Sequence, residues 1–80
     1  MPNYETFLTR IYEILRPFAK RGIILNEDSE LVTELGLTSL QVMELIEQLE
    51  DHFDISIPLN ILPDIRTVRD LAEQLEKLTR

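Results

Sequence analysis

The spacing of apolar residues is the feature that most constrains how this chain can fold. In three segments, apolar side chains recur every three or four positions, which is typical of one face of an amphipathic helix; these segments are residues 4–19, 39–53 and 67–78. Pro58 and Pro63 leave room for only a short helical turn between the last two segments. We therefore predict an all-α fold. It is a small antiparallel four-helix bundle, with three main helices, a short third helix and a long crossover loop after the first.

Each predicted helix has one stripe of residues that we expect in the core. The first stripe consists of Tyr4, Phe7, Leu8, Ile11, Ile14, Leu15 and Phe18, and Pro17 is expected to end or kink this helix near Leu15. The second stripe consists of Leu40, Met43, Leu45 or Ile46, Leu49 and Phe53. The third stripe consists of Val68, Leu71, Ala72, Leu75 and Leu78, after a cap at Thr67 with Asp70 three residues later. The crossover loop is expected to be anchored to the core by Ile23, Ile24 and Leu25.

Length and composition limit what the chain can do. Eighty residues, of which 44% are hydrophobic, predict a single domain over residues 1–80 with a modest core and little room for a substrate cleft. The absence of cysteine and the presence of one histidine argue against a disulfide framework and a metal site. No apolar run reaches the length of a membrane span, and the N-terminus has no signal-peptide pattern. We expect a cytoplasmic monomer.

Charge is distributed very unevenly along the chain. The formal net charge is −7, and no lysine or arginine occurs between Arg21 and Arg66. That interval contains ten acids: Glu27, Asp28, Glu30, Glu34, Glu44, Glu47, Glu50, Asp51, Asp54 and Asp64. Such a stretch repels nucleic acid and attracts a basic protein surface.

Ser39, at the start of the second helical segment, could be a helix cap, a nucleophile or an attachment point. Thr38 is the more natural cap, because Gln41 three residues later completes a capping box. A nucleophilic serine needs a base within hydrogen-bond reach. The single histidine, His52, is thirteen residues further along the same helix, about 20 Å away at 1.5 Å per residue. We therefore predict no enzymatic activity, and Ser39 is left free as an exposed attachment point.

The stretch ELGLTSLQVMELIEQLEDHFDISIP resembles the acyl carrier protein family of phosphopantetheine-binding domains. The matching positions are Gly36, Ser39, Leu40, Glu44, Leu45, Leu49, Glu50, Phe53, Ile55, Ile57 and Pro58, followed by a closing helix in DIRTVRDLAEQL. The resemblance implies a carrier on which a phosphopantetheinyl transferase attaches 4′-phosphopantetheine, taken from coenzyme A, to Ser39. The arm then holds acyl intermediates as thioesters for partner enzymes in fatty acid, polyketide or related lipid biosynthesis.

The resemblance also implies two further groups of residues. Acyl-transferring, ligase or synthase enzymes with basic patches would dock on Thr38, Leu40, Glu44, Glu47, Glu50 and Asp51. The acyl chain would be lined by Ile46, Leu49, Ile57, Leu62, Ile65 and Leu71.

Several residues depart from the family pattern. Thr38 replaces the usual aspartate before the serine, Gln41 is neutral at a position that is often acidic, and Glu47 replaces an often apolar residue. The segment LNILPD after Pro58 is rich in aliphatic residues, and one short turn cannot bury all of them. These departures favour a specialised carrier over a housekeeping fatty-acid carrier. The alternatives are a discrete peptidyl or aminoacyl carrier and an unmodified protein-interaction module of the same fold.

Overall fold

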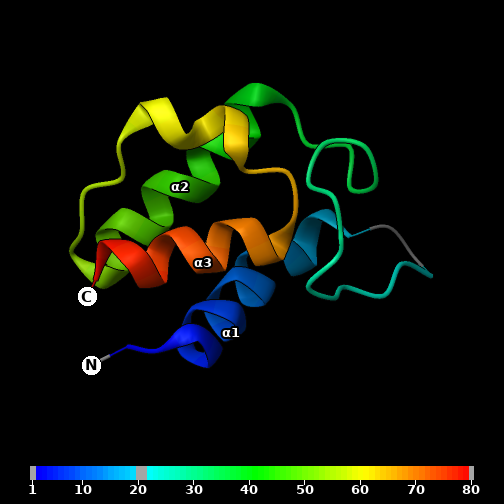
Figure 1. Cartoon of the computed structure of the whole chain (residues 1–80). Coiled ribbons are helices and arrows are strands. Elements are labelled where there is room, and N and C mark those ends of the chain that lie inside the picture. The colour runs from blue at the N-terminus through cyan, green and yellow to red at the C-terminus, as the bar shows by residue number, and fades with distance from the viewer. Residues whose placement is uncertain (1, 20–21, 80) are drawn as a thin grey trace.

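The computed structural model describes residues 2–19 and 22–79, and these residues form an all-α fold (Figure 1). The elements are the α-helices α1 (Tyr4–Leu15), α2 (Ser39–Phe53) and α3 (Val68–Leu78) and the 3₁₀ helices η1 (Arg16–Phe18) and η2 (Leu59–Asp64). Helix α1 runs antiparallel to α2 and α3, and the long crossover connects α1 to α2. The predicted helical bundle, with its short third helix, is confirmed. Every helix in the described residues is too short or too polar to cross a lipid bilayer.

The helices begin and end at residues with clear local reasons. Asn3 caps α1, because its Oδ1 accepts a hydrogen bond from the backbone N–H of Thr6 at 2.9 Å. Pro17 follows the end of α1 and the chain tightens into η1, as predicted from the proline. Helix α2 ends at Phe53 and is capped by Asp54, whose φ of 54° is in the left-handed region.

The core is formed by one buried face from each α-helix. Its fully buried side chains include Phe7, Ile11, Leu15, Leu49, Val68, Leu71 and Leu75. The rings of Phe7 in α1 and Phe53 in α2 meet edge to face, with centroids 4.7 Å apart. This contact joins α1 to the C-terminal end of α2.

The crossover loop is held against the N-terminus of α3 by backbone hydrogen bonds. The N–H of Leu31 donates to the carbonyl of Arg66 at 2.9 Å, and the N–H of Val68 donates to the carbonyl of Ser29 at 3.1 Å. The loop also contributes three buried leucines to the core, Leu31, Leu35 and Leu37. These contacts give the loop a defined path despite its lack of regular structure.

Side chains add further contacts between the loop and its neighbours. The hydroxyl of Tyr4 in α1 donates a hydrogen bond to Glu27, and Arg69 in α3 forms an ion pair with Asp28. Burial and the hydrogen bond to Glu27 raise the pKa of Tyr4 to about 12. The loop is thus fastened to both α1 and α3.

Some predictions of burial and helix bounds were wrong. Phe18 and Leu78 are partly exposed because each lies at or beyond the end of its helix. In the crossover loop Ile24 is 82% exposed, so of the three predicted anchors only Ile23 and Leu25 pack against the core. The short helix includes Pro63 instead of stopping before it. The missing N–H of Pro63 costs little there, because Pro63 is exposed to water.

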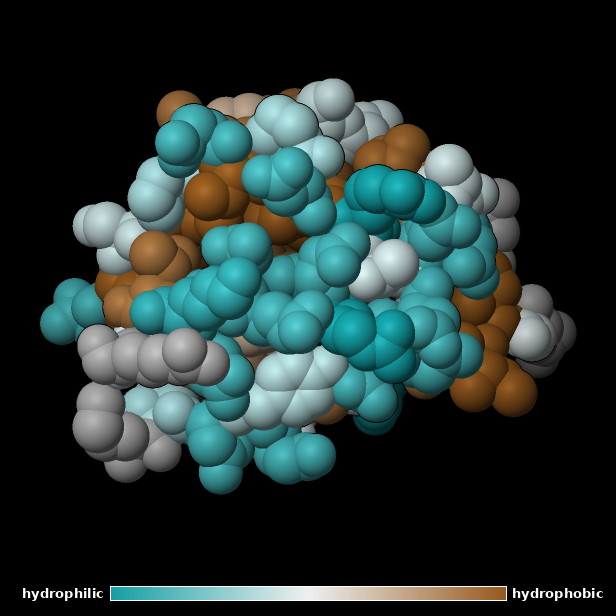
Figure 2. Space-filling view, viewed as in Figure 1, coloured by the Kyte–Doolittle hydropathy of each residue, from teal (hydrophilic) through white to brown (hydrophobic). Residues whose placement is uncertain are grey.

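Leu40 and Met43 at the start of α2 were also predicted in the core and are exposed, Leu40 by 66%. In α2 the buried residues are Leu45, Ile46 and Leu49, which begin one turn further along the helix. Figure 2 shows hydrophobic residues reaching the surface over the part of the molecule formed by α2 and η2. The first turn of α2 therefore presents apolar side chains to solvent.

Asp70 makes the start of α3 sensitive to acid. Burial alone would raise its pKa, but its carboxylate accepts hydrogen bonds from the backbone N–H groups of Arg66 and Thr67, at 3.0 and 3.1 Å, and the net result is a lowered pKa. A lowered pKa in the folded state contributes stability above the unfolded value of 3.8, and this contribution is lost as the pH falls through the folded value.

We therefore expect Asp70→Asn to flatten the acid limb of the stability curve. Between about pH 5 and pH 3, the free energy of unfolding of the wild type should fall more steeply than that of the variant. Urea unfolding at a series of pH values measures both slopes. Asp64→Asn, at an exposed aspartate in η2, is the matched control. Equal slopes for Asp70→Asn and the wild type would contradict the assigned role of Asp70.

Candidate functional site

Ser39 is the first residue of α2 and its side chain is exposed. Thr38 caps the helix: its Oγ1 accepts from the N–H of Gln41 at 3.1 Å, and the side chain of Gln41 accepts from the N–H of Thr38 at 2.9 Å. The predicted capping box is therefore present. Among the described residues, the hydroxyl of Ser39 has no hydrogen-bond partner, so it is free to react with a group brought from outside.

His52 does not form a catalytic pair with Ser39. It lies in the last turn of α2, where its ring packs edge to face against Phe53 with centroids 4.7 Å apart. Thirteen residues of helix separate the two side chains, about 20 Å along the axis. An activated serine nucleophile needs its base within hydrogen-bond reach. His52 is therefore too far away to activate the hydroxyl of Ser39.

A stripe of exposed side chains runs along α2 from the residue next to Ser39. It consists of Leu40, Glu44, Glu47 and Asp51, all exposed, at spacings of four, three and four residues. Residues three or four apart lie on the same face of a helix. We call this set the acidic stripe.

Glu50 differs from the acidic stripe, although it was predicted with it. Its Oε2 accepts a hydrogen bond from the backbone N–H of Ile57 at 2.8 Å, and its side chain is half-buried. This bond ties the segment after α2 back onto the helix. Glu50 therefore has a structural contact in addition to any contact with a partner.

A groove of about 290 Å³ opens beside Ser39, between α2, η2 and the crossover loop. Besides Ser39, it is lined by Val32, Val42, Met43, Leu62, Pro63 and Ile65. Its lining is almost entirely apolar, and it lies at the lower end of the usual size range of ligand pockets. We call it the Ser39 groove.

The predicted lining residues fall into two groups. Leu62 and Ile65 line the Ser39 groove, whereas Ile46, Leu49, Ile57 and Leu71 are buried in the core. Val42 and Met43 were missed as lining residues. Their spacing of three and four from Ser39 was a usable signal, because it places them on the same helix face as the serine.

An exposed serine on a capped helix, beside an apolar groove, is an arrangement that suits a domain that presents a carried group. The chain belongs to the family described as the phosphopantetheine attachment site, whose profile matches residues 9–75. It is therefore a non-catalytic carrier with a covalent 4′-phosphopantetheine group, in agreement with the resemblance found in the sequence.

Named relatives agree with this assignment. An acyl carrier protein of Syntrophobacter fumaroxidans is 41% identical over 54 residues, which cover 68% of this chain and 67% of the relative. The chloroplastic acyl carrier protein 3 of Cuphea lanceolata is 37% identical over 76 residues, covering 89% of this chain and 50% of the relative. A solved structure from Mycobacterium tuberculosis, provisionally named an acyl carrier protein, superposes with a TM-score of 0.64 at 39% identity. The match covers 90% of this chain and 92% of the other.

Proposed function

We propose that residues 1–80 form one carrier domain, which a phosphopantetheinyl transferase modifies on Ser39. In this reaction the Oγ of Ser39 forms a bond to the phosphorus of coenzyme A that bears the pantetheine arm. The bond from this phosphorus to the rest of the pyrophosphate breaks, and adenosine 3′,5′-bisphosphate leaves. The proton of the hydroxyl passes to a base of the transferase. The observation that carries the proposal is the free, exposed hydroxyl of Ser39, next to a threonine that already caps the helix.

The residues around Ser39 fit the attached group in two ways. A phosphodiester on Ser39 would lie at the N-terminus of α2, where the helix dipole and the unpaired N–H groups of the first turn favour negative charge. The Ser39 groove offers apolar surface next to the attachment point. When bound, the group supplies a terminal thiol that holds acyl groups as thioesters.

Loading of the purified protein tests the attachment. The apo protein is incubated with coenzyme A, Mg²⁺ and a transferase of broad specificity, and its intact mass is measured. We expect the mass to increase by one phosphopantetheinyl group, and peptide mapping is expected to place the increase on the peptide that contains Ser39. An unchanged mass with several transferases would favour the unmodified interaction module, for which the neutral Thr38 is the motivating feature.

Partner enzymes are proposed to dock on the acidic stripe, with Thr38 and Glu50 at its margins. The stripe begins beside Ser39, so a basic surface placed on it would come close to the attachment point. Exposed charge pairs contribute little energy each, whereas a patch of one sign speeds the encounter with a basic partner. Fast encounter and easy release suit a carrier that visits several enzymes in turn.

Charge reversal in the acidic stripe is expected to slow docking. Glu47→Lys should lower kcat/KM for loading by the transferase about tenfold at low salt, because steering by charge commonly accounts for this factor or more. The difference from the wild type should shrink as salt is added. Glu73→Lys makes the same change in net charge on an exposed residue of α3 and is the matched control. Equal losses in both variants would refute docking on α2.

The pathway is proposed to be a specialised one. The departures at Thr38, Gln41 and Glu47 support a carrier other than a housekeeping fatty-acid carrier. The exposed Leu59 and the half-buried Ile61 in η2 add apolar surface for a dedicated partner. Cytoplasmic location and a monomeric state remain predictions.

A further inference from the structure

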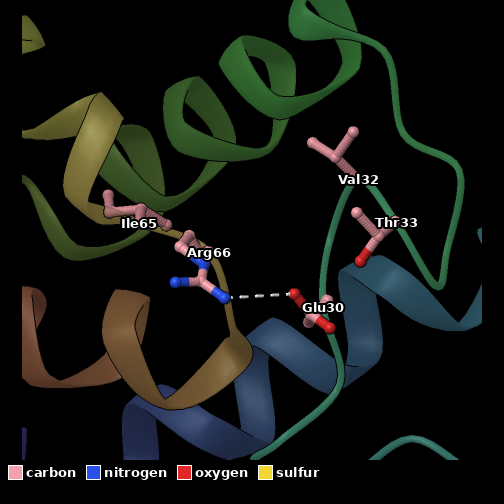
Figure 3. A pocket seen from close by; sticks show the side chains of 5 residues that line it. All are labelled: Glu30, Val32, Thr33, Ile65 and Arg66. Carbon is pink, nitrogen blue, oxygen red and sulfur yellow. Dashed lines mark ion pairs between the residues drawn. The ribbon is translucent and has the colours of Figure 1, made fainter.

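A second, smaller hollow adjoins the Ser39 groove (Figure 3). It has a volume of about 100 Å³ and is lined by Glu30, Val32, Thr33, Ile65 and Arg66. Val32 and Ile65 also line the Ser39 groove, so these two side chains form the boundary between the spaces. Apolar surface at Val32 and Ile65 therefore connects the groove beside Ser39 to the smaller space. We call the smaller space the Arg66 hollow.

Arg66 provides hydrogen-bond donors at the polar end of this path. Its Nη2 lies 3.6 Å from Oε1 of Glu30 across the hollow, and its side chain is 76% exposed (Figure 3). A guanidinium has five N–H donors and no acceptor, so one carboxylate at this distance leaves donors available. The Arg66 hollow can therefore bind a group that accepts hydrogen bonds.

The charges next to Arg66 favour an uncharged hydrogen-bond acceptor over an anionic one. Glu30 lies in the hollow itself, and a second carboxylate is close, because Oε1 of Glu34 accepts a hydrogen bond from the N–H of Glu30 at 3.2 Å. A further carboxylate entering the hollow would be repelled by both. An uncharged carbonyl oxygen avoids this repulsion and still accepts from the guanidinium.

We propose that the Arg66 hollow recognises an uncharged carbonyl oxygen on the acyl cargo, with Arg66 as the donor. The cargo class is then an acyl chain that carries a keto or amide oxygen beyond the thioester, in preference to a saturated chain. This inference rests on the proposed modification of Ser39. It adds a specificity-determining residue on α3's N-terminal side, outside the predicted lining set.

The test compares two cargoes of equal length on the loaded protein. The wild type is loaded with hexanoyl or 5-oxohexanoyl phosphopantetheine, loading is verified by intact mass, and cleavage of the thioester by exchange with 2-mercaptoethanol is followed. We expect the oxo cargo to be cleaved about fivefold more slowly than the saturated one, the factor expected of one hydrogen bond. The ratio of the two cleavage rates on the protein is divided by the ratio measured for the same two acyl groups on coenzyme A. In Arg66→Gln the corrected ratio should return to one.

A loss of selectivity in Arg66→Gln could come from loss of the donor or from loosening of the crossover loop when the ion pair with Glu30 is lost. The variant Glu30→Gln distinguishes these two explanations. Both variants remove the charge pair between Arg66 and Glu30, but only Glu30→Gln keeps the guanidinium. Selectivity retained in Glu30→Gln and lost in Arg66→Gln would support the proposal. Equal cleavage of both cargoes on the wild type, or loss of selectivity in both variants, would overturn it. Failure of Ser39 to load would overturn the proposed function together with this inference. Normal loading without selectivity would overturn this inference alone, so the two failures are distinguishable.

Discussion

Ser39→Ala is expected to abolish loading completely, with no mass increase after incubation with coenzyme A and transferase. The variant removes the only atom that forms the new bond to phosphorus. It should leave the fold intact, because Thr38 and Gln41, not Ser39, provide the cap of α2. An unchanged far-UV circular dichroism spectrum and melting temperature would verify this.

Other hydroxyl groups of the chain provide the comparison for Ser39. Thr38 is adjacent, but its Oγ1 is engaged with the N–H of Gln41, and Ser29 is buried. Ser56 is exposed in the segment after α2 and is the matched control. We expect Ser56→Ala to load at the wild-type rate. A mass increase that persists in Ser39→Ala would move the attachment point elsewhere and refute the proposal.

Phe7→Ala is expected to remove a large part of the stability of the domain. Phe7 is fully buried and its ring meets Phe53 edge to face, so truncation creates a cavity where α1 meets α2. Such substitutions cost about 3–5 kcal/mol. A chain of this length is stable by only about 4–12 kcal/mol, on a scale of 0.05–0.15 kcal/mol per residue. Urea unfolding followed by circular dichroism measures the loss.

Phe18→Ala separates this effect from a general sensitivity to loss of an aromatic ring. Phe18 lies in η1, beyond the end of α1, and is partly exposed. Its truncation should cost clearly less than that of Phe7, because 36% of Phe18 is already exposed to solvent, whereas Phe7 is fully buried. A cost for Phe18→Ala equal to that for Phe7→Ala would show that burial in this core had been misassigned.

Local sequence patterns predicted most of the helices and the exposed position of Ser39 at the start of α2. The period of three and four residues, the capping boxes at Thr38 and Thr67 and the proline at position 17 act within one or two turns of chain. Such interactions involve only near neighbours, so they can be read without knowing the fold. The position of Ser39 after its cap follows from the same local rules.

Tertiary contacts decided which apolar residues became core and which became surface. Periodicity places Leu40, Met43 and Leu45 on α2. It does not show which turns of this helix are covered by other elements of the fold. In the structure the covering elements begin at Leu45, and the uncovered first turn of α2 becomes one wall of the Ser39 groove. Likewise, Arg66 lies beside Glu30 only because backbone hydrogen bonds bring the crossover loop to the start of α3. The exposed serine at the start of α2 is thus a local property of the sequence, whereas the groove and the Arg66 hollow exist only because distant segments pack together.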